Sequence, residues 1–170
     1  APTEAANAAF AYNIFGTPGK IVSDERVEDL GIRRIRFANN VMLNIKTTDF
    51  QKDKVMLSLR VDGGNLLATR DDPTRVSLAS SIMLGGLEAH SVDGLRSGVA
   101  GKTVSPGFGA GIDAFGGSAL TSPEDFALQA KLMAAFLTHP GYRPDGLALI
   151  RRVLPQQYAA NDATPAAVLG

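Results

Sequence analysis

The stretch IRRIRFANNVMLNIKTTDFQKDKVMLSLRVDGG, residues 32–64, has the clearest pattern in this chain. Apolar and polar residues alternate in three runs, which occupy residues 32–37, 41–48 and 55–62. This period of two is typical of strands that bury one face. Asn39 and Asn40 separate the first two runs and tolerate the positive φ of a tight hairpin turn. We therefore predict a three-stranded antiparallel meander with one face on a core.

The residues after the meander change to helical spacing. Within residues 74–84 the apolar side chains recur at intervals of three and four, at Val76, Leu78, Ala79, Ile82 and Met83. Gly85 and Gly86 follow and predict the end of a buried helix. Ser91 can cap a second, short helix that ends near Val99. Residues 102–122 are rich in glycine without a helical stripe, which predicts two weak strands.

Two further helices are predicted near the C-terminus. Ser122, Pro123 and Asp125 form a helix start, and an apolar face follows. That face consists of Phe126, Ala130, Met133, Phe136 and Leu137. Pro140 ends this helix, and the next one spans about 144–158, where Pro155 should kink or shorten it.

The length of 170 residues suits one core, so we predict a single α+β domain over residues 19–160. In this fold class an antiparallel sheet, the meander plus further strands, is packed on one side by helices. Residues 1–18 have the composition of a linker. Residues 161–170 contain Thr164 and Pro165, which have the form of a helix start with only a few residues after it. We interpret them as the start of a truncated next helix.

Composition makes several function classes improbable. Seventeen Lys and Arg balance seventeen Asp and Glu, which gives no electrostatic reason to bind nucleic acid or a membrane surface. No apolar run has the length of about 20 residues that crosses a bilayer. The chain has no cysteine, which excludes disulfides and thiol catalysis.

The ordered series of elements resembles one known family. It runs from FGTPGKIVSDERVEDLG at residues 15–31, through the meander and a helix that ends in LGG, to HSVDGLRSGVAGKTV and LTSPEDFALQAKLMAAFLTHPGY. In this order the chain is similar to the M16 zinc metallopeptidases, the insulinase or pitrilysin-like group. The resemblance implies an α+β unit of a kind that occurs in tandem around a closed peptide chamber. The phrase RFANNVMLNIKTTDF looks most like the third unit of a long bacterial member.

The family's active unit carries an inverted zinc motif, H-x-x-E-H, on the helix after the meander. Two histidines one turn apart bind the metal, and the glutamate acts as the base. At the corresponding positions this chain has Leu78, Ser81 and Ile82, none of which can replace those groups. We therefore predict no catalytic residue, no metal site and no cofactor in this chain, with zinc held by the catalytic domain of the parent protein. No substrate-binding residue is identified.

The chain contains two histidines, His90 and His139, and neither lies in such a motif. Glu88 stands near His90 and could join it on a metal, but a loop or cap role is the favoured interpretation. His139 lies in the last turn of a predicted helix, where an imidazolium complements the helix dipole. We interpret it as a capping residue.

Other candidate motifs are incomplete. Gly109, Gly111 and Ala114 match a relaxed dinucleotide-binding fingerprint, but strand-like sequence follows where a helix should begin. Arg33, Arg34 and Arg36 form a local basic patch. It is most simply a solvated strand face, and a wall that attracts peptides is the alternative. Residues 151–158 have the spacing of an arginine and tyrosine pair that family members use on substrate. In the family, however, that pair belongs to the final unit.

Two functions remain open. The favoured one is a non-catalytic chamber unit of an M16-type peptidase, inactive alone, whose partners are the other units of the same chain and the peptide substrate. The alternative is a free-standing scaffold or interaction domain with the same fold. Apolar surface without its partner units makes self-association of the chain plausible. The resemblance to long bacterial members implies the periplasm or the cell envelope.

Overall fold

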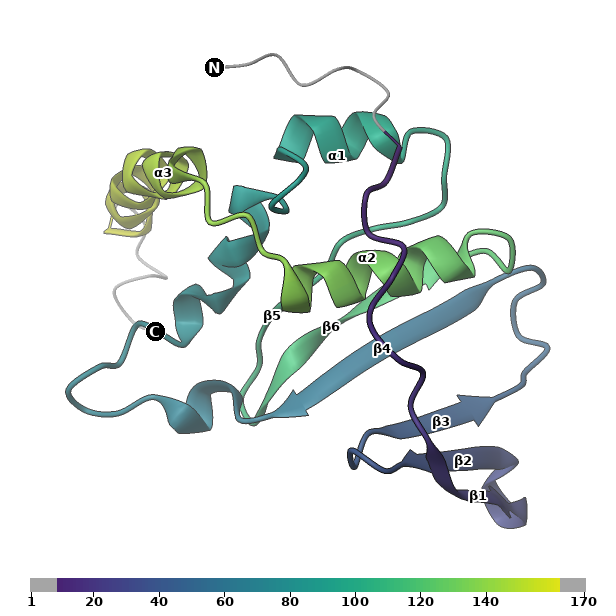
Figure 1. The fold of residues 1–170 in the computed structure, drawn as a ribbon. Coiled ribbons are helices and arrows are strands. Elements are labelled where there is room, and N and C mark those ends of the chain that lie inside the picture. The colour runs from purple at the N-terminus through teal and green to yellow at the C-terminus, as the bar shows by residue number, and fades with distance from the viewer. Residues whose placement is uncertain (1–8, 163–170) are drawn as a thin grey trace. The chain divides into compact units, whose positions relative to one another are not determined.

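A computed structural model describes residues 9–162 of the chain (Figure 1). The described chain divides into two compact units. Residues 14–54 form the smaller unit, and the rest of the described chain forms the larger one. Within residues 9–162 no helix combines the length and the apolar character needed to cross a membrane. The single domain expected over residues 19–160 stays a prediction, as does the linker role of residues 1–18.

The smaller unit is an antiparallel sheet with the strand order β1-β2-β3. Its elements are β1 (Ile21–Val27), the short 3₁₀ helix η1 (Glu28–Leu30), β2 (Ile32–Phe37) and β3 (Met42–Lys46). The hairpin predicted between the first two runs is confirmed as β2 and β3. Asn40 has φ 67°, and the Phe37 amide donates to the Val41 carbonyl at 2.9 Å. Strand β1 was not predicted, because its sequence lacks a clean alternation.

The third run of the predicted meander does not join this sheet, so that part of the prediction is wrong. It forms β4 (Val55–Asp62), which pairs along its whole length with β6 (Ala114–Thr121) in the larger unit. The eight-residue ladder is supported by a hydrogen bond between the Ser58 and Ser118 hydroxyls at 3.0 Å. The prediction that β3 turns one face to a core is also wrong, since all five of its residues are exposed.

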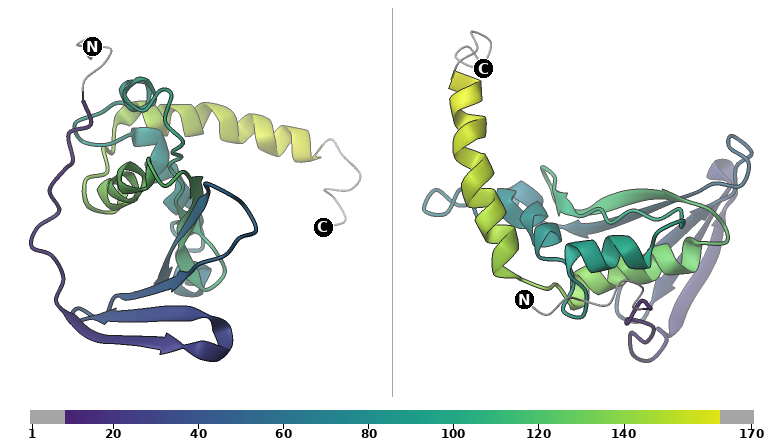
Figure 2. Two further views of the ribbon diagram at one scale, coloured as in Figure 1. Left: turned by 90° about the vertical axis from the view of Figure 1, so that its right-hand side faces the viewer. Right: turned by 90° about the horizontal axis from the view of Figure 1, so that it is seen from above.

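The larger unit contains a second antiparallel sheet, with the order β4-β6-β5. Strand β5 is only Gly109–Ala110, so the two strands predicted in the glycine-rich region are confirmed as β5 and β6. Helices α1 (Val92–Gly98) and α2 (Phe126–Thr138) lie on one face of this sheet (Figures 1 and 2). The buried core contains Leu87, Leu95, Leu132, Ala135 and Phe136. The expected α+β fold class is confirmed.

Side chains from β6, from α2 and from Asp125, the residue just before α2, bind the segment 103–105. The Asp125 carboxylate accepts the Thr103 amide at 2.8 Å, and the Thr121 hydroxyl donates to the Thr103 carbonyl at 2.6 Å. Gln129, which is fully buried, both accepts the Ser105 amide and donates to the Ser105 carbonyl. These bonds satisfy polar groups that would otherwise be costly to bury. The Thr103 amide, and secondarily the Lys102 ammonium, lowers the pKa of Asp125.

The predicted caps are largely present. The Ser91 hydroxyl caps α1 by accepting the Gly94 amide at 3.0 Å. The Ser122 hydroxyl accepts the Asp125 amide at 3.1 Å, but the α-helix itself begins later, at Phe126. Helix α2 ends before Pro140, as expected.

Two helical predictions need correction. Residues 77–85 form a 3₁₀ helix, η3 (Ser77–Gly85), and not an α-helix; a shorter 3₁₀ turn, η2 (Gly64–Leu67), precedes it. Helix α3 (Pro144–Asp162) continues through Pro155 and is not shortened. Pro155 is exposed, so water can solvate the carbonyl that loses its partner. Residues 161–162 belong to α3, and the predicted helix start at Thr164 and Pro165 lies outside the described residues.

Candidate functional site

Segment η3 contains Leu78, Ser81 and Ile82, the three residues that the sequence analysis placed at the positions of a zinc motif, so its geometry decides what these side chains can do together. A 3₁₀ helix has about three residues per turn, so side chains three positions apart lie on the same face. Leu78 and Ser81 therefore share a face, whereas Ile82 lies about 120° away from Leu78 around the axis. In an α-helix the same two side chains would be only about 40° apart. The motif positions Leu78 and Ile82 thus do not converge on one point.

Two cavities lie between η3 and α3, and both reach Leu78 and Ser81. The first has a volume of about 410 Å³ and is lined mainly by apolar groups, including Ile82, Phe108, Leu147 and Ile150. The second has a volume of about 390 Å³ and is lined by Leu84, Leu149, Ile150, Val153 and Leu154, among others. The motif positions therefore open onto an apolar groove.

A zinc ion does not fit these residues. Zinc is held by imidazole, thiolate or carboxylate groups, and Leu78, Ser81 and Ile82 supply none of them. Across residues 9–162 there is no group of three or more histidine, aspartate or glutamate side chains that could hold a metal ion. No hydrolytic step can be derived from this position.

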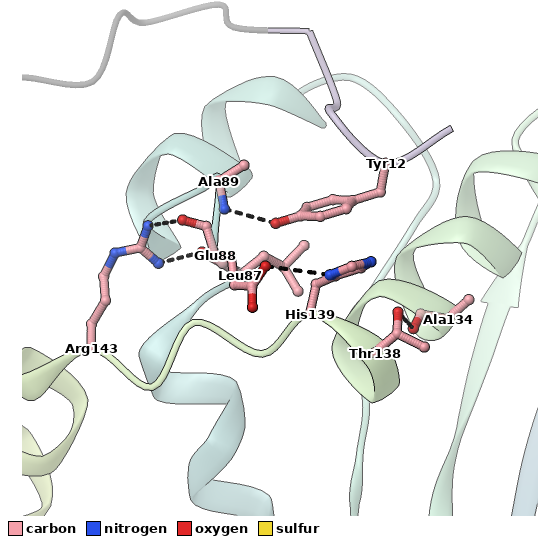
Figure 3. Close-up of polar contacts among 8 residues, drawn as sticks. All are labelled: Tyr12, Leu87, Glu88, Ala89, Ala134, Thr138, His139 and Arg143. Carbon is pink, nitrogen blue, oxygen red and sulfur yellow. Dashed lines mark hydrogen bonds and ion pairs between the residues drawn. The ribbon is translucent and has the colours of Figure 1, made fainter. Parts of the chain in front are cut away.

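The histidines occupy structural positions. His90 is buried, with 3% of its surface exposed, and its Nε2 accepts the Ala11 amide at 3.0 Å. Glu88, which sequence reasoning considered as a co-ligand, has its carboxylate 3.3 Å from Nδ1 of His139 (Figure 3). His139 is the C-cap residue of α2, and its amide donates to the Ala135 carbonyl at 2.7 Å. The two histidines and Glu88 thus bind other parts of the fold.

Arg143, at the entry to α3, is a residue that sequence reasoning missed. Its guanidinium donates to the carbonyls of Gly85, Leu87, Glu88 and His90. Two of these bonds, to Leu87 and Glu88, are drawn in Figure 3. A guanidinium carries five N–H donors in a planar fork, whereas a lysine ammonium carries three, so an arginine suits a cluster of four carbonyls. Arg143 therefore fixes the loop that follows η3 to the start of α3.

Glycine is required within that loop. Gly86 has φ 65°, and a Cβ there would lie 2.6 Å from the His90 carbonyl oxygen. The predicted glycine stop after residue 84 is thus a tight turn that allows four carbonyls to gather around one guanidinium. The doubled glycine was a visible signal for the turn, but nothing in the local sequence pointed to Arg143 as its partner.

The remaining candidates belong to different elements of the two units. Gly109, Gly111 and Ala114 form the turn region between β5 and β6, so no helix opens there as a dinucleotide site requires. In the smaller unit, Arg33 forms a bidentate pair with Asp24, at 2.9 and 2.6 Å. The Arg33 hydrogen bond lowers the pKa of Asp24.

A second arginine of that patch follows the same pattern. Arg34 pairs with Glu25 at 2.7 Å, which fits a solvated, partly paired strand face. Arg151 and Tyr158 lie on α3, where both are exposed. Neither Arg151 nor Tyr158 lines the two cavities beside Leu78 and Ser81.

Comparison with solved structures identifies the fold. The chain superposes on part of a mutant of the ferredoxin protease FusC, crystallised in complex with Arabidopsis ferredoxin, with a TM-score of 0.79 and 20% identity over 96% of this chain. It also superposes on the periplasmic protease PqqL from Escherichia coli, with a TM-score of 0.77 and 15% identity over 94% of this chain. The chain therefore has the fold of a segment of these two proteases.

The match covers only a small part of each protease. This chain spans 18% of the FusC chain and 18% of the PqqL chain. No protein-family model matches the sequence, and no curated protein matches it either. At this level of identity the similarity establishes the fold and leaves the chemistry to be argued from the residues.

Proposed function

We propose that this chain acts as a non-catalytic unit of an M16-type zinc-dependent peptidase. In this role it forms part of the wall of a peptide chamber and packs against other units of a longer protein, while a different unit binds zinc. It corresponds to the third unit of a long bacterial member. One observation carries the proposal: the chain has the fold of a segment of two proteases, and Leu78, Ser81 and Ile82, which we assign to the zinc-motif positions, lie on a 3₁₀ segment and supply no zinc ligand.

The proposed role accounts for the surface around η3. Leu78 is 45% exposed, Leu147 is 50% exposed, and Tyr142 at the edge of the first cavity is 74% exposed. Grouped large apolar side chains at a surface are typical of sites that contact other protein. Neighbouring units of the same protein are the proposed partners for this surface.

The substrate class and location are proposed by analogy. The FusC structure contains a bound protein, ferredoxin, and PqqL is described as periplasmic. We therefore propose that the longer protein acts on peptide or protein substrates in the periplasm or cell envelope. Any chamber-facing residues of this chain would guide the substrate without cleaving it.

The test compares this chain with the longer protein that contains it. Zinc is measured by elemental analysis, and cleavage is followed with a fluorogenic peptide library. We expect less than about 0.1 zinc per chain and no cleavage for this chain, and both zinc and cleavage for the longer protein. One zinc per purified 170-residue chain, or peptide cleavage that a chelator abolishes, would contradict the proposal.

A free-standing scaffold domain is the second candidate, and the exposed apolar side chains around η3 favour it equally. The two candidates differ in the surrounding sequence. An intact H-x-x-E-H motif elsewhere in the same protein supports the chamber unit, whereas a protein without one supports the scaffold. Sedimentation of the chain adds a second measure, since self-association that Tyr142→Ser abolishes would indicate that this surface binds protein.

A further inference from the structure

The two faces of the sheet β1-β2-β3 differ in chemistry. Side chains alternate along a strand, so Ile35 lies on one face with Arg33 and with its cross-strand partner Leu43. The strands place these charged residues on the other face, which we call the basic face: Glu25, Arg34, Arg36 and Lys46. The structure therefore divides the basic patch of the sequence between the two faces of the sheet.

The basic face is the side of this sheet that stays in contact with water. An antiparallel sheet commonly packs one face on protein and leaves the other solvated. Ile35 on the opposite face is 6% exposed, whereas the Arg34 side chain is 43% exposed and Lys46 is exposed as well. A ligand in solution can therefore reach the basic face.

Cations outnumber carboxylates on the basic face by three to one, although the chain as a whole has no net charge. Glu25 accepts from Nε and Nη2 of Arg34, at 2.8 and 2.7 Å, so Nη1 of that guanidinium keeps its hydrogens for another acceptor. Among residues 9–162 no carboxylate forms an ion pair with Arg36 or Lys46. We propose that the basic face binds acidic segments of the peptide substrate through these three cations.

The spacing of the cations matches that of an extended peptide. Arg34 and Arg36 are two positions apart on β2, which is about 6.6 Å along a strand. Lys46 on β3 pairs directly with Ile32, so it lies diagonally from Arg34, at about 7–8 Å. Alternate side chains of an extended peptide repeat at about 6.6 Å as well. A segment with a carboxylate at every second position can therefore place one carboxylate near each cation.

The inference rests on the proposed function, because a unit in the wall of a peptide chamber meets its substrate as a flexible chain. Cations without carboxylate partners raise the local concentration of acidic ligands and speed their encounter with the wall. Binding of an acidic peptide requires neither zinc nor cleavage. The binding test can therefore fail while the zinc and cleavage measurements succeed, and the reverse also holds.

Fluorescence anisotropy of labelled peptides with this chain tests the basic face. Three peptides of equal length alternate glycine with glutamate, glutamine or lysine. At about 50 mM salt we expect the glutamate peptide to bind at least about tenfold more tightly than the other two. At about 500 mM salt this preference should largely disappear, because salt screens exposed charges. Equal binding of the glutamate and glutamine peptides at low salt would overturn the proposal, as would a preference that salt leaves unchanged.

Paired variants show whether the basic face is the binding surface. Arg36→Gln combined with Lys46→Gln should weaken the glutamate peptide about tenfold. Arg26→Gln combined with Arg152→Gln is the matched control, because it removes the same charge from exposed residues outside the basic face. Arg26 lies opposite Arg33 on the other face of the sheet, and Arg152 lies on α3. This control should change the affinity by less than about twofold.

The charge itself is tested by Arg36→Lys combined with Lys46→Arg, which keeps both cations and should bind the glutamate peptide like the wild type. Equal weakening in the basic-face variant and in the matched control would overturn the proposal, because net charge alone would then explain the binding. A single-stranded oligonucleotide that competes for the basic face and binds more tightly than the glutamate peptide would also overturn it.

Discussion

Helices α2 and η3 are both apolar helical segments of the larger unit, but they pack in different ways. Helix α2 turns one face to the core, where Leu132 and Ala135 have no exposed surface. In η3 the three-residue repeat divides the side chains among three directions, and Leu78 remains 45% exposed. The comparison shows that an apolar segment at helical spacing can be either a core element or the lining of a surface groove.

The largest difference should appear in stability. Leu132→Ala removes a fully buried side chain from α2 and is expected to lower the free energy of unfolding by about 2–5 kcal/mol. Leu78→Ala in η3 should cost less than about 1 kcal/mol, because the side chain is already partly in water. Urea unfolding followed by circular dichroism measures both. Equal losses for the two variants would remove the distinction between α2 and η3.

A smaller effect is expected where the loop after η3 is fixed to α3. Arg143→Ala removes one donor from each of four carbonyls, of which those of Leu87 and His90 keep a backbone donor, and should lower the free energy of unfolding by about 1–3 kcal/mol. Arg152→Ala on the exposed side of α3 is the matched control and should change it by less than about 0.5 kcal/mol. If the two variants unfold at the same urea concentration, the loop does not depend on Arg143.

The smallest effect concerns acid stability on the α2 side. The pKa of Asp125 is lowered in the folded state by the Thr103 amide, so the unfolded state binds a proton more readily. The stabilisation is complete above the ordinary carboxyl pKa and is lost as the pH falls through the lowered pKa. Asp125→Asn should therefore lower the urea midpoint at neutral pH and flatten its decline in acid. A decline as steep as that of the wild type would argue against Asp125 as the cause.

The sequence predicted the parts of the fold that depend on local pattern. The Asn39–Asn40 turn and the Ser91 cap are set by residues within a few positions of one another, and both are present. The pairing of β4 was mispredicted because its partner, β6, lies about fifty residues further along the chain. A period of two indicates that a strand exists, but it does not indicate which strand lies beside it.

In the candidate site, too, local sequence predicted some features and could not predict others. Sequence reasoning placed Leu78, Ser81 and Ile82 at the motif positions, and the structure adds that they do not converge. Apolar spacing in residues 74–84 fits both three and four residues per turn, so the choice of a 3₁₀ helix could not be made locally. Three serines in η3 also favour competing local hydrogen bonds over an α-helix. The bonds of His90 to Ala11 and to Arg143 join residues more than fifty positions apart, which no local pattern encodes.

The most direct test of the account is an attempt to restore the zinc motif. The triple variant Leu78→His, Ser81→Glu and Ile82→His supplies the ligands and the base of H-x-x-E-H, and zinc affinity is measured by competition with a chromophoric chelator. We expect no site tighter than about 10 µM, because in a 3₁₀ segment the two imidazoles lie about 120° apart. A stoichiometric, nanomolar zinc site would show that the segment adopts α-helical geometry, and it would contradict the assignment of η3 as a segment that cannot hold the metal.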